Sequence, residues 1–468
     1  MRVIIHNELH PEDNAMLASL YSRSPASVLE HIKKVTAAGS GKFMEQYYVG
    51  YGHQSIGDCG NITVYFEDIS MLAAKAIEDD PLFSGQESSS RYIDWSNQPF
   101  SLASDFDSAT PEAQILDQTL FLTSLRKFYV DTKPKLIEHL KIVYPIKPDE
   151  EPKIYNKAIE ARAFDILRGF LPAGATTNVA YTGSLRDVGT HIEKLLFHPL
   201  NEVKMIAQQA YLELANKYPN SFKPGVVACI TKEGGGGWKD EYLNYVSDHR
   251  NFYDIDSFNT QLKKPISGVS MRGSQLICPY HELDDELMPY RQQDRPKYQK
   301  FMRHGSFGNS FNVPMTANLD FGSFRDLQRH RRGYCSMPVL TTKSGFHSWY
   351  LDSLPITLRS EAISLLKRVS ELANSMTIDN CLKEQYIIPM GFKVEVNLVY
   401  DIPQMVYVAE LRSGNTVHAT LRPIAQQMAN VLNEMGIKTY HDNSADPWSI
   451  RRGSQDIVEK EQVADHGE

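Results

Sequence analysis

Arginine is concentrated in one short segment of this sequence, the run RDLQRHRR from Arg325 to Arg332. If residues 324–332 are helical, Arg325, Arg329 and Arg332 share one face of that helix. Three guanidinium groups on one face repel one another unless an anion neutralises them. Phosphate suits them because it accepts paired, charge-assisted hydrogen bonds. The run therefore indicates a phosphate-binding site.

The neighbours of these arginines leave a second interpretation open. Asp320 and Asp326 could balance the arginines on an ordinary solvated helix face, and spacing alone does not separate the two interpretations. His330 adds a titratable ring, and the surrounding cations favour its neutral form. A single histidine is more often a structural residue than a catalyst, so His330 needs support from its surroundings.

Further cations occur in both halves of the chain. In the second half, Arg412 and His418 follow Glu410 and are consistent with another wall of an anion pocket, although a surface helix would look the same. In the first half, the run SSSRY at residues 88–92 combines hydroxyl groups, backbone N–H groups and the cation Arg91. Such a run is a candidate phosphate cradle, with a plain polar loop as the alternative. Two more arginines, Arg168 and Arg186, lie near the ends of expected helices.

Short strings recur about half a chain apart. HQSIGD at residues 53–58 returns as HGSFGN at 304–309, and IAQQ occurs at both 206–209 and 424–427. The arginine run occurs only in the second half, and the Ser-x-Arg-Tyr string at 89–92 only in the first. The sequence therefore predicts a duplicated domain whose chemistry needs both halves.

Length and composition agree with two domains. A chain of 468 residues with 42% hydrophobic residues is globular and too long for one ordinary core. We expect domains at 1–235 and 246–468, with a glycine-rich tether at about 232–245. The net charge of −8 argues against a general nucleic-acid binder, including a DNA binder, but is compatible with a local basic pocket. No apolar stretch approaches the roughly 20 residues of a membrane span. Five scattered cysteines, without zinc-ligand spacing, favour a reduced, cytoplasmic protein without a metal site.

Hydrophobic periodicity predicts both helices and strands in this chain. The expected strands lie at about 61–66 and 393–400. The expected helices lie at 27–38, 68–78, 111–143, 157–170, 201–217, 356–376 and 416–434.

Taken in order, these motifs resemble the flavin-dependent thymidylate synthases (ThyX). In the first half, the matching pieces are Gly52–Ser55, Glu67–Ser70, Ser89–Tyr92, Arg168–Pro172 and Ser184–Arg186; in the second they are His304–Ser306, Arg329–Arg331, Glu410–Arg412 and His418-Ala419. Each copy also departs from the pattern. The first has Glu78-Asp79-Asp80 in place of Arg-His-Arg, and the second has Gly333–Pro338 in place of Ser-x-Arg-Tyr and Gln385–Pro389 in place of Arg-x-x-Leu-Pro. The losses are nearly reciprocal, as expected if one kind of composite site survives.

The resemblance implies two ThyX-like domains, each a mixed or antiparallel sheet flanked by helices (α/β, α+β). It implies reductive methylation of dUMP to dTMP, with methylenetetrahydrofolate, FAD and NADPH. The residue roles it implies are catalytic for Arg329, His330 and Arg331, cofactor-binding for these three and for His53, Ser55, Arg186 and His418, and substrate-binding for Ser89, Arg91, Arg168 and Arg412. Because family members are homotetramers with shared sites, it also implies a homodimer that forms a pseudo-tetramer.

Two alternatives remain beside this hypothesis. The first is a flavoenzyme on the same scaffold that modifies another pyrimidine nucleotide or uses another carbon donor, since each copy lacks arginines of the pattern. The second is a non-catalytic protein that binds nucleotides or RNA through the cluster around Arg329.

Overall fold

The computed structural model describes residues 9–21, 28–50, 54–91, 94–231, 240–264, 273–278, 312–414 and 416–444. The chain forms two compact units. Unit 1 comprises 1–69, 73–87 and 177–252, and unit 2 comprises 70–72, 88–176 and 253–468. This division in space does not follow the predicted sequence halves, because residues 88–176 cluster with the second half. The predicted boundaries at 1–235 and 246–468 stay a prediction, and most of the predicted tether lies outside the described residues.

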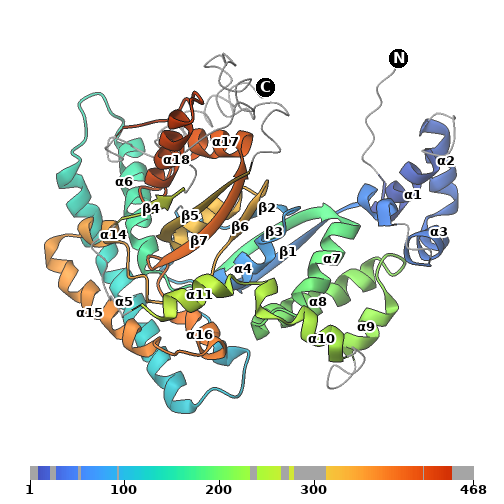
Figure 1. Cartoon of the computed structure of the whole chain (residues 1–468), viewed down its shortest axis with the longest axis horizontal. Coiled ribbons are helices and arrows are strands. Elements are labelled where there is room, and N and C mark those ends of the chain that lie inside the picture. The colour runs from blue at the N-terminus through green and yellow to red at the C-terminus, as the bar shows by residue number, and fades with distance from the viewer. Residues whose placement is uncertain are drawn as a thin grey trace. The chain divides into compact units, whose positions relative to one another are not determined.

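Unit 1 is built on a three-stranded sheet in the order β1-β3-β2 (Figure 1). Its strands are β1 (Asn61–Ser70), β2 (Ser84–Glu87) and β3 (Thr176–Ser184), and β2 pairs antiparallel with β3. The helices of this part of the chain are α1 (Pro11–Tyr21), α2 (Val28–Ala38), α3 (Gly41–Phe43), α4 (Met71–Glu78), α7 (Leu185–Leu195), α8 (Asn201–Lys217), α9 (Pro224–Thr231) and α10 (Asp240–Val246), with a π-helix at Met44–Gly50 and 3-10 turns at Gln54–Cys59 and His249–Asn251.

Unit 2 is built on a four-stranded antiparallel sheet in the order β4-β5-β7-β6. Its strands are β4 (Gln275–Ile277), β5 (Asn312–Asp320), β6 (Tyr334–Ser336) and β7 (Lys393–Asp401). Figure 1 shows helices around this sheet. They are α5 (Glu112–Val143), α6 (Pro152–Leu167), α11 (Ile255–Leu262), α13 (Phe321–Gln328), α14 (Ser348–Asp352), α15 (Ile356–Leu372), α16 (Ile378–Glu384), α17 (Ile402–Arg412) and α18 (Arg422–Glu434), with 3-10 turns η3 (Ala103–Asp105), η4 (Arg168–Phe170) and η8 (Gln385–Ile387).

Three strands run directly into a helix through a polar capping residue. The side chain of Ser184 accepts from the backbone N–H of Asp187 at the start of α7, at 3.0 Å. Asp320 caps α13 and Asp401 caps α17 in the same way. Each side chain satisfies a helix N–H group that has no partner within the helix. The last residue of each strand therefore fixes where its helix begins.

The two copies face each other through equivalent backbone groups in unit 2. Met390 N donates to Leu171 O at 2.8 Å, and Ala173 N donates to Ile388 O at 2.9 Å. Leu171 and Ile388 are equivalent positions of the two copies, and so are Ala173 and Met390. The two hydrogen bonds are therefore equivalent, as in a twofold contact between identical subunits. The segments after η4 and η8 thus meet as they would in a dimer, which supports the duplication.

The predicted α/β class with antiparallel sheets and flanking helices is confirmed, and α8 has the predicted bounds. Three helix starts were predicted wrongly. The helix expected from Lys157 begins at Pro152. The helix expected from Asp68 begins at Met71, because β1 continues through Ser70, and the helix expected from Thr416 begins at Arg422. The expected helix at 356–376 ends at Leu372. Within the described part of the chain, no helix combines the length and apolarity that a membrane crossing requires.

Candidate functional site

The predicted shared face of three arginines is wrong, because α13 ends at Gln328. Arg325 is buried and donates from Nη1 to Met71 Sδ at 3.0 Å. Arg332, beyond the helix, pairs with Asp401 at 2.8 Å. Only Arg329, the C-cap residue, is exposed. The three side chains therefore contact different parts of the protein and form no shared cationic face. The candidate site is centred on another residue.

That centre is Asp326 in the last turn of α13, and its first partner is Arg168. Arg168 Nη1 lies 3.2 Å from the Oδ2 atom of Asp326, and Nη2 donates to Ser323 Oγ at 3.4 Å. The guanidinium lies against Gly322, where an added Cβ would come within 3.0 Å of Nε. A larger residue at this position would crowd the guanidinium group, so Gly322 leaves space for Arg168.

Arg412, the last residue of α17, reaches the same turn. Its Nη2 donates to the backbone oxygen of Asp326 at 2.9 Å, and its Nε donates to His330 Nε2 at 2.7 Å. Arginine has no acceptor, so the Nε2 atom of His330 must be unprotonated. This agrees with the predicted neutral form of His330. The ring of His330 also meets the ring of Tyr407 edge-on, with centroids 5.9 Å apart.

Arg91 approaches from the first half of the chain. It forms a two-pronged ion pair with the buried Asp165, at 2.7 Å from Nε to Oδ1 and 3.1 Å from Nη2 to Oδ2. Its Nη2 also donates to the backbone oxygen of Thr416 at 3.3 Å. Arg91 is therefore held close to the segment after α17, although it is 325 residues from Thr416 in sequence.

The electrostatics of Asp326 show how closely the arginines gather. Burial alone would raise the pKa of Asp326, but Arg168, Arg329, Arg412 and Arg91, in decreasing order, hold it well below its usual range. We call Asp326 with these four arginines the Asp326 cluster. It contains substrate-binding residues predicted from the first half (Arg91, Arg168) and from the second (Arg412). All five lie in unit 2 of a single chain.

Through Ser323, Arg168 contacts a buried network of polar side chains. The Oγ atoms of Ser323 and Thr420 are 2.6 Å apart, and Thr420 Oγ1 donates to Asp320 at 2.7 Å. Tyr350 donates its hydroxyl to the same carboxylate at 3.1 Å. Every member is buried and hydrogen-bonded. Such a network orients Arg168 rigidly.

His418 belongs to this network and not to an open surface. It is fully buried, with Nε2 3.0 Å from the backbone oxygen of Asp165 and Nδ1 2.8 Å from Thr420 Oγ1. Burial, with Arg168 as the next cause, lowers its pKa well below the usual value. Both ring nitrogens are engaged inside the protein, so this geometry offers no atom of His418 to a cofactor.

The other predicted residues are placed as follows. Ser89 is half-buried, and its Oγ accepts from the backbone N–H of Arg91 at 3.3 Å. Arg331 is half-buried beside His330. His53 and the side chain of Ser55 lie outside the described residues.

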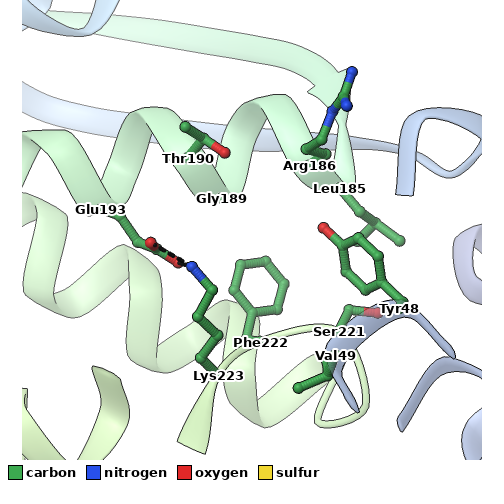
Figure 2. Close-up of a pocket in the computed structure, with 10 residues that line it drawn as sticks. All are labelled: Tyr48, Val49, Leu185, Arg186, Gly189, Thr190, Glu193, Ser221, Phe222 and Lys223. Atoms are coloured by element: carbon green, nitrogen blue, oxygen red, sulfur yellow. Dashed lines mark hydrogen bonds and ion pairs between the residues drawn. The ribbon is translucent and has the colours of Figure 1, made fainter. Parts of the chain in front are cut away.

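Arg186 lies in unit 1, at a small pocket of about 100 Å³ between α7 and the segment before α9 (Figure 2). Its Nε is 2.5 Å from Asp58 Oδ1, and Glu193 on the same helix pairs with Lys223 at 2.9 Å. Figure 2 shows the rings of Tyr48 and Phe222 beside these groups. Burial and Glu193 raise the pKa of Tyr48 to about 12. The pocket's cations thus already have carboxylate partners.

Two residues of the site were missed by sequence reasoning. Asp165 anchors Arg91, and Gly322 provides the space for Arg168. Asp165 lies three residues before Arg168 and three after Arg162, but nothing in that spacing points to Arg91. Asp326 had been considered only as a charge that balances a helix face.

Comparison with known proteins agrees with the predicted resemblance. Residues 4–220 match the model of the family Thy1, described as thymidylate synthase complementing protein. A UPF0159 protein of Thermoplasma acidophilum is 24% identical, over 90% of this chain and 93% of its own. A UPF0159 protein of Chlamydia muridarum is also 24% identical, over 83% of this chain and 77% of its own. The similarity to these two relatives extends over both halves of the chain.

Proposed function

We propose that this chain, which matches the model of the thymidylate synthase complementing protein (Thy1) family over residues 4–220, is a thymidylate synthase-like enzyme that converts dUMP to dTMP. The carbon donor would be methylenetetrahydrofolate, and the reductant would be NADPH acting through FAD. The observation that carries the proposal is the Asp326 cluster, in which Arg168 from the first half of the chain pairs with the carboxylate of Asp326 and Arg412 from the second half binds its backbone oxygen. The charges of Arg329 and Arg91 also lower the pKa of this carboxylate. All four stand at positions where the family motifs place arginine in one copy or the other.

The cluster supports phosphate binding through rigid donors. Arg168 is buried and bound by Asp326 and Ser323, and Arg412 donates to His330. Preorganised guanidinium groups lose little freedom when they bind a phosphate, so each hydrogen bond retains more of its energy. In this arrangement, Arg168, Arg412 and Arg91 would hold the nucleotide phosphate.

The described residues fit FAD only in part. The exposed Arg329 and the half-buried Arg331 are suited to the flavin's diphosphate. His418 does not fit, since both of its nitrogens are used internally. When bound, FAD would supply the redox chemistry, while the protein contributes position and positive charge.

His330 would act through Arg412 and not as a base at Nε2. Its Nε2 lone pair already accepts from Arg412, so that nitrogen is not available for a proton from substrate. We therefore assign His330 a positioning role that holds Arg412 against the turn after α13. Arg329 would contact ligand directly, because it is the exposed arginine of the cluster.

The test combines cofactor content with genetic rescue. The purified protein is expected to carry or take up FAD, to bind dUMP, and to rescue a thymidine auxotroph. Arg412→Ala should abolish rescue, whereas Arg368→Ala, on the exposed surface of α15, should retain it. A colourless protein that takes up no FAD and binds no nucleotide would overturn the proposal.

A second candidate function is modification of another pyrimidine nucleotide by a flavoenzyme of the same scaffold. The departures from the family motifs favour it, because each copy lacks arginines of the pattern. Bound flavin without rescue of the auxotroph would support this candidate. Binding of RNA by a flavin-free protein would instead support a non-catalytic binder.

A further inference from the structure

The carboxylate of Asp326 is placed where a bound anion would meet the arginines. Its Oδ2 atom accepts from Arg168, and Arg329, Arg412 and Arg91 all act on its charge. The side chain of Arg168 is 2% exposed and cannot turn to solvent. Without a ligand, Asp326 is the carboxylate that pairs directly with the buried Arg168, with Asp320 and Asp165 as further counter-charges.

The same carboxylate has one direct hydrogen-bond partner among the described residues. Apart from the bond to Arg168, its side chain has no further hydrogen bond among the residues that the structure describes, and it is 15% exposed. It stands in the last turn of α13, followed by the exposed Arg329. Rotation of one side chain would therefore free Arg168 for another anion while the backbone contact to Arg412 persists.

From these contacts we infer that Asp326 is an internal competitor for the ligand's phosphate. A phosphate that reaches Arg168 and Arg412 must displace the carboxylate or remain beside it, and both outcomes weaken binding. The penalty grows with the charge of the ligand, so a dianion such as phosphate suffers more than a monoanion. Asp326 thereby sets the affinity and charge preference of the cluster. This inference requires that the Asp326 cluster binds an anion. It rests on the proposed function only for the identity of the natural ligand.

The experiment measures binding of inorganic phosphate and of nitrate to the full chain by calorimetry at constant ionic strength. Asp326→Asn keeps the shape of the side chain and removes its charge. We expect it to bind phosphate about tenfold more tightly than the natural protein, with a smaller gain for nitrate. The matched control is Asp117→Asn on α5, which removes an exposed carboxylate paired with Arg368 at 3.5 Å and should leave both affinities unchanged.

Equal or weaker binding of phosphate by Asp326→Asn would overturn the inference, as would an equal gain for nitrate. If Asp326→Asn unfolds because Arg168 has lost its counter-charge, phosphate should raise its melting temperature more steeply than that of the natural protein. An identical rise with sodium chloride at the same ionic strength would then count against the inference.

Binding of dUMP separates this inference from the proposed function. If the natural protein binds dUMP and rescues the auxotroph but Asp326→Asn gains no affinity, the function stands and the inference fails. If Asp326→Asn gains affinity for phosphate but neither protein binds dUMP, the inference stands and the function fails.

Discussion

Helices α4 and α13 each follow directly after a strand, but α4 is followed by acidic residues and α13 by basic residues. After α13 come Arg329 and His330, and arginines surround the last turn at Asp326. After α4 come Asp79 and Asp80. Asp79 pairs with Lys75 at 2.5 Å, and Asp80 accepts from the hydroxyl of Tyr181 and, at 3.0 Å, from the N–H of Leu82. One end is a cationic cluster around the carboxylate of Asp326, and the other has acidic residues bound by neighbouring side chains.

The surrounding elements extend this contrast. Helices α7 and α17 both have 11 residues, but α7 ends at Leu195 where α17 ends at Arg412. The turn η4 begins with Arg168, whereas η8 begins with Gln385, whose Oε1 accepts from the backbone N–H of Leu340 at 2.9 Å. The backbone repeats while the charged side chains do not. Duplication thus allowed one copy of each charged motif to be lost, because the remaining copies meet in unit 2.

The strongest test of this contrast asks whether the cluster forms within one chain. Arg91→Ala and Arg412→Ala should each weaken dUMP binding by about 100-fold, since each removes a charge-assisted contact. Co-expressing the two variants with different tags should restore no binding, because both residues belong to unit 2 of the same chain. Recovery of high-affinity sites in the mixed sample, measured by calorimetry, would show that the site is shared between chains.

The next largest effect is expected at the two equivalent turns. Arg168→Ala should lower the free energy of unfolding by about 3 kcal/mol, because it leaves Asp326 without its ion pair in a buried site. Gln385→Ala removes neutral hydrogen bonds at the equivalent position and should cost only about 1 kcal/mol. Urea unfolding of both variants compares them directly. Equal losses would mean that charge does not distinguish the two turns.

Buried histidines should make stability fall in mild acid. Burial lowers the pKa of His198 well below its usual value in unit 1, and that of His347 to about 4 in unit 2. The unfolded chain takes up protons near pH 6.5, while the folded protein does not, so stability declines as the pH falls below about 6.5. Each histidine should contribute about 1 to 2 kcal/mol to this decline.

Urea unfolding between pH 5 and 8 checks this, with His198→Gln and His347→Gln each expected to flatten the slope. The carboxylate of Asp326 contributes to stability over a different pH range. Its pKa is held low in the folded protein, so its stabilisation persists above the ordinary carboxylate pKa and is lost only in stronger acid. A slope that stays unchanged in both histidine variants would refute the assignment.

The smallest effect is expected at the end of α4. Tyr181→Phe removes the hydrogen bond to Asp80 and should cost about 1 kcal/mol of unfolding free energy, without change in dUMP binding. Tyr65→Phe, on the exposed surface of β1, is the matched control and should cost nothing measurable. Weaker dUMP binding by Tyr181→Phe would mean that the acidic end of α4 also takes part in ligand binding.

Local patterns were sufficient for much of the fold. The helical spacing predicted α8 at its observed bounds, and alternation predicted β7. Prediction failed where distant partners decide. The expected helix through Arg332 stops at Gln328, because the chain must turn for Arg332 to pair with Asp401 and for β6 to join β7.

The candidate site divides in the same way. The arginine types, and their distribution between two incomplete copies, were visible as motifs in order along the chain. The partner of Arg91 and the space for Arg168 were not visible, since Asp165 and Gly322 look ordinary in their own segments. His418 matched a motif, yet its ring is hydrogen-bonded within a buried network.

The sequence by itself determined that this protein has a repeated scaffold with cations retained in only part of each copy, because periodicity and motif order are local properties of the chain. Only the tertiary structure decided that Arg91, Arg168, Arg329 and Arg412 converge on Asp326. That convergence depends on packing between segments hundreds of residues apart. The effect of the charge of Asp326 depends on these neighbours, which no local pattern of the sequence identifies.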